Sequence, residues 1–340
     1  MKALRVYEKN KMAVEDVPVP KLEPHEVLIK VHRVGICGTD LGVLHGYVPA
    51  EFPVTLGHEF SGTIAQLGKP SLGGVKVGDP VAVSGGWGCG VCDLCQKGLA
   101  PFCKNRISLG RNTDGCMAEY VKVDYRVVHP LPPQVTLDEA QNFVNIACVL
   151  RGIQKLPLPL GQTAVIFGPG NMGYIALQVL RLAGISQAVM VGRRDFRLEM
   201  AKKLGATRTI HEAREDPVSK ILNEYPQGMD IVIEASGNPS CFASSCQVVK
   251  SKGTILSYGI YSQKIKELDL SFLYNKEPMI LGSKGGEGGY PLALSLLAEK
   301  KLQLLPMITH RFPLAEGVRA FQTFEDRNIN ALRVLIEPFA

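Results

Sequence analysis

The stretch Thr163-Ala-Val-Ile-Phe-Gly-Pro-Gly-Asn-Met-Gly173 decides how the middle of the chain folds. It begins with an apolar, β-branched run that is typical of a buried strand, and Tyr174–Ala183 continues it with apolar residues at helical spacing. The glycines therefore join a strand to a helix, which is the setting that a dinucleotide-binding fingerprint requires. Gly168 would allow a tight turn, Gly170 a close approach of the backbone to a pyrophosphate, and Gly173 close packing of the helix on the strand.

Strands and helices alternate on the C-terminal side of this turn. Short apolar runs such as Ala188–Val191, Asp230–Ala235 and Gly253–Tyr258 are separated by helical segments such as Pro217–Glu224 and Cys241–Val249. This alternation predicts an α/β fold with a doubly wound parallel sheet, the Rossmann arrangement.

The second strand of the sheet carries the signal for the type of dinucleotide. Chains that bind NAD place Asp or Glu at its end, where the carboxylate binds the ribose hydroxyls. Here Gly192-Arg193-Arg194 follows instead, and two guanidinium groups would suit a 2′-phosphate. Alternatively both arginines are solvated, and Asp195 caps the helix Phe196–Leu204 or reaches the ribose. We favour NADP over NAD. The predicted cofactor-binding residues are Gly168, Pro169, Gly170, Asn171, Met172, Gly173, Gly192, Arg193, Arg194 and Ser236.

The N-terminal half has a different character, with short strands and few helical signals before residue 137. Val27–Val34 alternates between apolar and polar residues from Ile29 onward, and the region Val54–Val83 continues the pattern between glycines. These features predict a barrel of short strands. A chain of 340 residues is long enough for about two domains.

Three potential metal ligands lie in two short motifs of this half. Cys37 lies in Cys37-Gly-Thr-Asp40, and His58 and Glu59 lie in Gly57-His58-Glu59. A lone Cys is more often a small buried apolar residue. Together, however, a thiolate, an imidazole and a carboxylate are ligands that Zn²⁺ takes at a catalytic centre. We therefore predict a catalytic zinc site.

A second metal site is indicated by four cysteines in fifteen residues, Cys89, Cys92, Cys95 and Cys103. Four thiolates form a closed tetrahedral zinc site with no open position, so this zinc is predicted to be structural. It would stabilise a glycine-rich lobe over residues 85–104.

These motifs resemble those of the zinc-dependent medium-chain dehydrogenase/reductase family, the alcohol and polyol dehydrogenases, over essentially the whole chain. The resemblance implies that Cys37 and His58 bind the catalytic zinc, that Glu59 lies beside it, that Thr39 hydrogen-bonds the substrate oxygen and that Asp40 orients His58. It also implies a GroES-like catalytic domain over residues 1–146, a Rossmann domain over 147–284 and a return to the catalytic domain over 285–340. The zinc lobe lies near a subunit contact in the family, so a homodimer or homotetramer is expected.

Two positions depart from the family pattern. Members carry a third zinc ligand at the point that aligns with Val144-Asn145, and valine cannot coordinate a metal. Either Glu59 binds the zinc with a water in the fourth position, or Asn145 or Cys148 replaces the missing ligand, or the site is weak or empty. We predict direct binding by Glu59. The histidine that completes the proton relay in several members is replaced by Gly42, and nearby His45 is a hypothetical substitute.

The resemblance and motifs together predict an NAD(P)-dependent oxidoreductase that oxidises a secondary alcohol or polyol to the ketone, with two zinc ions per chain. Alternatives are different chemistry, such as epimerisation through a bound nicotinamide, or nucleotide binding without turnover. The net charge of +6 comes from scattered residues with no basic run, which argues against nucleic acid as a partner. The N-terminus has no signal-peptide pattern, and no apolar stretch reads as a membrane span. With nine cysteines and no export signal, we expect a cytoplasmic enzyme.

Overall fold

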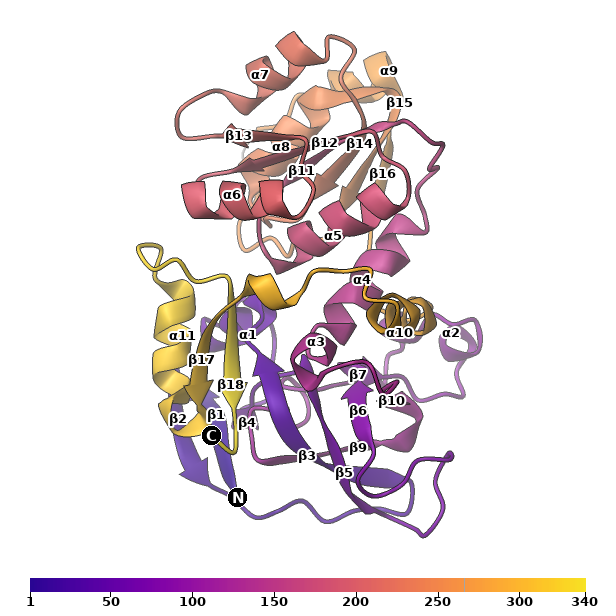
Figure 1. Ribbon diagram of the computed structural model, residues 1–340, viewed down its shortest axis with the longest axis vertical. Coiled ribbons are helices and arrows are strands. Elements are labelled where there is room, and N and C mark those ends of the chain that lie inside the picture. The colour runs from indigo at the N-terminus through magenta and orange to yellow at the C-terminus, as the bar shows by residue number, and fades with distance from the viewer. Residues whose placement is uncertain (266) are drawn as a thin grey trace. The chain divides into compact units, whose positions relative to one another are not determined.

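The computed structural model describes residues 1–265 and 267–340, which divide into two compact units (Figure 1). The catalytic unit comprises Met1–Val144 and Tyr290–Ala340, and the nucleotide unit comprises Asn145–Gly289. The sequence analysis predicts domain boundaries at 146/147 and 284/285. The glycine-rich segment after residue 284 packs within the nucleotide unit, where Arg151 donates a hydrogen bond of 3.0 Å to the carbonyl of Glu287.

Strands dominate the catalytic unit and form two larger sheets. A seven-stranded sheet has the order β10 (Val128–Pro130), β6 (Pro80–Val83), β5 (Phe60–Leu67), β3 (Glu26–Gly35), β18 (Arg333–Glu337) and β17 (Ile308–Pro313), with β9 (Tyr120–Asp124) also paired to β3. A three-stranded sheet has the order β2 (Lys11–Asp16), β1 (Lys2–Glu8) and β4 (Val54–Thr55). Alternate residues of β3, including Val27, Ile29 and Val31, are fully buried in one apolar core. Period-two burial of this kind is what the sequence pattern of this strand predicts.

The C-terminus returns to the middle of the larger sheet. β18 runs antiparallel to β3 and pairs Leu335 with Gly35 and Ile336 with Val34. β3 leads directly into Cys37 and helix α1 (Gly38–Leu44), so the last strand lies beside the segment that carries the first predicted zinc ligand. The other α-helices of this part of the chain are α2 (Asp93–Gln96), α3 (Leu137–Ala140), α10 (Tyr290–Ala298) and α11 (Gly317–Glu325).

A small lobe between β6 and β9 contains the four clustered cysteines. It consists of the two-stranded sheet β7 (Gly86–Trp87) with β8 (Ile107–Ser108), the single turn of α2 and a 3-10 turn over Ala100–Phe102. Elements this short bury little apolar surface, so the lobe depends on cross-links for its stability.

The nucleotide unit is a six-stranded parallel sheet, as predicted. Its order is β13 (Arg208–His211), β12 (Gln187–Gly192), β11 (Thr163–Phe167), β14 (Met229–Glu234), β15 (Val249–Ser257) and β16 (Met279–Gly282). The connecting helices are α5 (Asn171–Leu182), α6 (Asp195–Lys203), α7 (Pro217–Glu224), α8 (Pro239–Val248) and α9 (Ser271–Lys276), preceded by α4 (Phe143–Ile153). α5 and α6 lie on one side of the sheet and α7 and α9 on the other (Figure 1). Among the described residues, no helix is both long and apolar enough to cross a membrane.

The strand order locates the ligand-binding edge of this unit. Strand order reverses between β11 and β14, and open parallel sheets bind ligands beyond the carboxyl ends of the strands at such a point. The Gly168–Gly173 turn, Gly192 and Ser236 all follow strand ends, so the topology brings them to this edge.

Candidate active site

The structure brings Cys37, His58 and Glu59 together. Their ligand atoms all lie within 4.8 Å of one another. Cys37 is the N-cap of α1, and its Sγ accepts a hydrogen bond of 3.4 Å from the backbone N–H of Thr39. His58 and Glu59 immediately precede β5. Sulfur, nitrogen and carboxylate oxygen at this separation are donors that fit one zinc ion.

The Asp40 carboxylate contacts the Nδ1 side of the His58 imidazole ring. Its side chain is 2% exposed, Oδ1 lies 3.3 Å from His58 Nδ1, and Oδ2 accepts a hydrogen bond of 2.9 Å from the backbone N–H of Cys37. Burial tends to lower the pKa of His58, but the Asp40 and Cys37 charges outweigh burial and raise it well above its ordinary value. A carboxylate at Nδ1 favours the tautomer whose Nε2 is free to bind a metal. Thr39 Oγ1 lies 3.6 Å from the Cys37 sulfur, on the same turn of α1.

Arg333 is a member of this site that sequence reasoning missed. It is 1% exposed, and Nη1 lies 2.5 Å from Glu59 Oε2. Its Nε donates a hydrogen bond of 2.7 Å to Gln141 Oε1, and Nη1 also contacts the carbonyl of Ile36. A Cβ on Gly35 would lie 1.9 Å from Nη2, so the guanidinium fits only because residue 35 is glycine. The signal in the sequence was an arginine directly before the apolar run Val334–Ile336 of the last strand.

The ion pair with Arg333 determines the state of Glu59. Burial favours a higher pKa for this carboxyl group, but Arg333 and His58 outweigh burial and lower its pKa. Glu59 Oε1 lies 3.8 Å from His58 Nε2, on the side of the other candidate ligands. One carboxylate oxygen therefore faces the guanidinium and the other faces the metal donors.

Val144, at the position of the family's third ligand, is buried and carries no metal-binding atom, and Asn145 and Cys148 follow it on α4. Among the described residues, the groups of converging ligand atoms are Cys37 with His58 and Glu59, and the four lobe cysteines; neither group includes Cys148.

The missing relay histidine has a structural reason. A Cβ on Gly42 would lie 2.4 Å from Val48 Cγ2, so a side chain there would collide with the turn that follows α1. His45 is engaged in other contacts, with Nδ1 2.7 Å from Asn10 Oδ1 and Nε2 2.5 Å from Glu325 Oε1. These contacts argue against His45 as a substitute relay residue.

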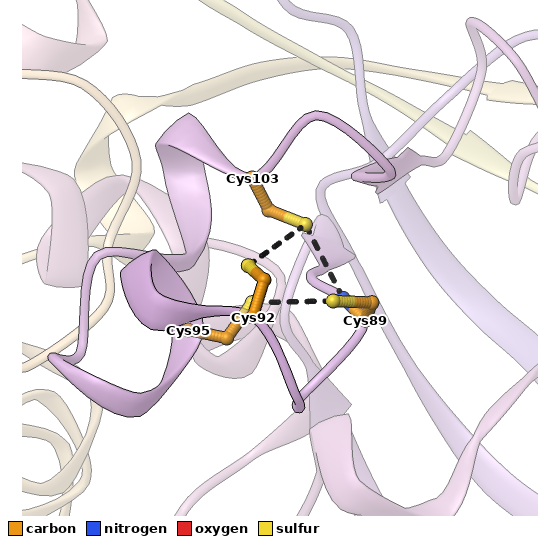
Figure 2. Close-up of side chains that lie close together, drawn as sticks. All are labelled: Cys89, Cys92, Cys95 and Cys103. Carbon is orange, nitrogen blue, oxygen red and sulfur yellow. Dashed lines mark hydrogen bonds between the residues drawn. The ribbon is translucent and has the colours of Figure 1, made fainter.

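The four lobe cysteines converge as the spacing predicts, and Figure 2 shows their sulfurs turned toward one another. Cys92 Sγ and Cys103 Sγ are 3.8 Å apart, and Cys89 Sγ and Cys95 Sγ are 4.0 Å apart. A tetrahedron with Zn–S bonds of about 2.3 Å has sulfur–sulfur edges of about 3.8 Å. Hydrogen bonds from the backbone N–H groups of Val91 and Cys92 lower the pKa of Cys89 to about 6, which favours the thiolate. The donor set therefore fits a closed zinc site.

Arg126 supports this lobe and was also missed. Its guanidinium forms a two-pronged ion pair with Asp124, with Nε 2.9 Å from Oδ1 and Nη2 2.5 Å from Oδ2. Nη1 is directed at the cysteine loop, where a Cβ on Gly90 would lie 2.5 Å from it. A positive charge at this place offsets part of the negative charge that four thiolates bring to a zinc ion.

The glycine turn has the geometry that a dinucleotide needs. Gly168 has a φ of +105°, and a Cβ on Gly173 would lie 2.1 Å from the carbonyl oxygen of Gly168. A Cβ on Gly170 would meet nothing within 4 Å, so this N-cap of α5 faces open space. Backbone N–H groups at such a helix N-terminus bind phosphate.

Arginine side chains surround the end of β12. Arg193 Nε donates to Glu212 Oε1 at 2.7 Å, while the guanidinium groups of Arg194 and Arg197 lie 5.3 and 5.7 Å from the ring of Phe196. Burial, with the like charge of Arg194, lowers the pKa of Arg197 to about 10. Arg197 Nη1 donates to the carbonyl of Pro169 at 3.2 Å, so this missed residue contacts the phosphate turn itself.

The sequence leaves two other roles for Asp195, as the cap of α6 or as a ligand of the ribose. The helix begins at Asp195, and its N-cap is Arg194. The Asp195 carboxylate forms two hydrogen bonds with Arg214, of 2.9 and 2.6 Å. Asp195 therefore does not cap α6, and its carboxylate pairs with Arg214 on the protein surface.

Comparisons with known proteins match both units. The alcohol dehydrogenase GroES-like domain matches residues 23–133, and the zinc-binding dehydrogenase domain matches residues 172–299. D-arabitol-phosphate dehydrogenase of Enterococcus avium is 33% identical over 336 residues, covering 96% of this chain and 94% of its own length. The chain belongs to the zinc-dependent medium-chain dehydrogenase/reductase family.

Two further comparisons also extend over nearly the whole chain. Sorbitol dehydrogenase of Halalkalibacterium halodurans is 31% identical, covering 96% of this chain and 95% of its own length. The crystal structure of a putative zinc-binding dehydrogenase from Sinorhizobium meliloti, bound to NADP, has a TM-score of 0.93 at 30% identity and covers 99% of each chain. The predictions of family, α/β fold with GroES-like and Rossmann parts, and enzyme class are confirmed. This medium-chain dehydrogenase is an NAD(P)-dependent oxidoreductase that acts on the CH–OH group of alcohols and polyols.

Proposed function

We propose that the enzyme oxidises a secondary alcohol of a polyol to the ketone, with two zinc ions per chain and NADP as the preferred cofactor. One zinc ion is held by Cys37, His58 and Glu59, and the other by the four lobe cysteines. The observation that supports the catalytic site best is the convergence of the first three side chains, with Asp40 behind the imidazole. The missing ligand at Val144 makes Glu59 a direct ligand in this proposal.

Each side chain has a defined task in this reaction. When bound, zinc supplies a Lewis acid that lowers the pKa of the alcohol, and the nicotinamide accepts the hydride. Thr39 hydrogen-bonds the substrate hydroxyl and passes its proton toward solvent. Asp40 keeps the Nε2 of His58 directed at the metal, and Arg333 holds Glu59 ionised. The epimerisation and non-catalytic alternatives are less well supported, because they leave this set of residues without a task.

The activity is tested by oxidation of a panel of polyols. We expect the zinc-loaded enzyme to reduce NADP with D-arabitol, sorbitol, galactitol or their phosphates, and to give the ketone. The panel includes free and phosphorylated polyols because the relatives' names include both D-arabitol-phosphate and sorbitol. Cofactor reduction is followed by absorbance, and the product is identified by mass and NMR. Absence of turnover with every polyol, at two zinc ions per chain, would reject this substrate class.

The cofactor preference is tested at the end of β12. An Arg193→Ala, Arg194→Ala double variant should bind NADPH about 10- to 100-fold more weakly, because charge-assisted hydrogen bonds to a phosphate are lost. NADH, which lacks the 2′-phosphate, should change by no more than about threefold. The matched control is the Arg208→Ala, Lys220→Ala double variant, whose cationic groups pair with Glu224 instead. Unchanged NADPH affinity, measured by calorimetry, would rule out the phosphate-binding role.

We also propose a homo-oligomer in the cytoplasm. β16 is the last strand of its sheet, and its Met279 and Ile280 side chains are 44% and 43% exposed. An apolar edge strand of this kind is a surface for pairing with a second copy. The cytoplasm is supported by the cysteines, none of which forms a disulfide within the described part of the chain, and by zinc sites that need reduced thiolates.

A further inference from the structure

Glu234 is a fully buried carboxylate that the proposed reaction does not use. It is the last residue of β14. Its Oε1 accepts hydrogen bonds from the backbone N–H groups of Ser236 at 2.8 Å and Gly237 at 3.0 Å, and from the Ser236 hydroxyl at 2.5 Å. Its Oε2 accepts a hydrogen bond of 2.7 Å from the Tyr261 hydroxyl. Two backbone donors on one oxygen fit an ionised carboxylate, which only accepts.

This carboxylate links the loops that follow two neighbouring strands. Ser236 and Gly237 follow β14, whereas Tyr261 follows β15 and lies with its hydroxyl 2.9 Å from Ser257 Oγ. The contact is close, because a Cβ on Gly259 would lie 2.2 Å from Glu234 Oε2. Burial and the neighbouring Glu234 raise the pKa of Tyr261, so the phenol stays protonated and remains a donor.

The linked loops lie against the phosphate turn. A Cβ on Gly168 would lie 2.8 Å from the backbone nitrogen of Ser236, and the N–H of Ala235 donates to the carbonyl of Phe167 at 2.9 Å. A dinucleotide spans the point where strand order reverses, with its adenosine half at the β11–β12 side. The nicotinamide half therefore belongs at the carboxyl ends of β14 and β15, where Glu234 lies.

Among the described residues, the Glu234 carboxylate has no cationic partner. All of its donors are backbone N–H groups or hydroxyls, and within the described part of the chain no Lys, Arg or His forms an ion pair with it. A negative charge in a low-dielectric interior acts strongly on a charge nearby. The oxidised nicotinamide ring is a cation and the reduced ring is neutral. The negative charge of Glu234 therefore attracts the oxidised ring more strongly than the reduced ring.

We propose that Glu234, fixed by Tyr261 and Ser236, is a positioning residue that favours binding of the oxidised nicotinamide cofactor over the reduced one. This inference rests on the proposed function, since it requires a nicotinamide dinucleotide at this edge of the sheet. It gives the enzyme a bias toward binding the form of the cofactor that oxidises an alcohol.

The test compares dissociation constants for NADP⁺ and NADPH, measured by calorimetry on the full chain. Glu234→Gln removes the charge and keeps a polar side chain, and should weaken NADP⁺ relative to NADPH by roughly tenfold. Tyr261→Phe keeps the charge and loses one loop contact, so both forms should weaken by the same factor. Two variants are the matched controls. Glu224→Gln alters a surface carboxylate that pairs with Arg208, and Tyr274→Phe alters a tyrosine that is 88% exposed.

The outcomes separate this proposal from the proposed function. If the unaltered chain binds neither form, dinucleotide binding itself fails. If it binds both and Glu234→Gln weakens both equally, the carboxylate only supports the loops and the proposal is overturned. Should Glu234→Gln not fold, Tyr261→Lys places an ammonium group beside Glu234 and should lower the preference for NADP⁺ in the same direction. An unchanged ratio in that variant would also overturn the proposal.

Discussion

Replacing His58 with alanine should remove one of two zinc ions from each chain and lower kcat/KM for a polyol by about a thousandfold or more. The remaining donors would be Cys37 and Glu59, and Glu59 is already paired with Arg333. Two protein ligands hold zinc poorly. Loss of the metal removes the Lewis acid, which contributes several kcal/mol to the transition state, and each 1.36 kcal/mol is about tenfold in rate.

Zinc content and rate are measured on the same preparation. The four lobe cysteines should keep their zinc, so the content falls from two to one and not to zero. His310→Ala is the matched control, because His310 lies on β17 and its Nδ1 contacts Thr309 Oγ1 instead of a metal ligand. A His58→Ala enzyme that retains two zinc ions and normal turnover would contradict the assigned catalytic centre.

Ligand residues close together in the chain were predictable, because spacing alone places their side chains. One loop and the single turn of α2 contain Cys89, Cys92 and Cys95. In so short a segment, few backbone conformations keep the three sulfurs apart. The pair His58 and Glu59 was equally local. The turn of α1 explains why Cys37 joins them: Cys37 and Asp40 form a capping box, a pattern that is normally read from Ser or Thr and is overlooked with Cys.

Partners supplied by distant strands were not predictable. Arg333 reaches Glu59 only because β18 pairs with β3, and no local pattern gives the register of two strands some 300 residues apart in the chain. Tyr261 and Glu234 meet for the same reason, since each follows a different strand of the parallel sheet. In both places a glycine marks the contact. Arg333 occupies the space that a Cβ on Gly35 would take, and Glu234 occupies the space that a Cβ on Gly259 would take.

The cofactor site shows a different limit. The sequence shows that no carboxylate ends β12. It does not show that the Asp195 carboxylate pairs with Arg214. The loop after β13 supplies Arg214 to that carboxylate, and Arg197, on the first turn of α6, donates back to the carbonyl of Pro169. Neither contact follows from the local sequence, because each joins segments that come together only in the folded sheet.

Arg333→Met should destabilise the zinc-free enzyme by about 3–5 kcal/mol, because removing one partner of a buried ion pair leaves the other charge uncompensated. The charge left is that of Glu59, which is 2% exposed. Methionine fills much of the same volume, so lost packing contributes little. Arg319→Met is the matched control: Arg319 is exposed, its pair with Glu316 is on the surface, and the change should stay within about 0.5 kcal/mol.

Zinc should recover much of this loss if Glu59 is a direct ligand. A metal ion beside the carboxylate supplies the positive charge that Arg333 no longer provides, and a ligand that binds only the folded state stabilises that state. Zinc should therefore raise the unfolding temperature of Arg333→Met more than that of the unaltered enzyme. The measurement is thermal unfolding of apo and zinc-loaded protein. Equal zinc-induced shifts in the two proteins would mean that Glu59 does not bind the metal, and that its carboxylate serves Arg333 alone.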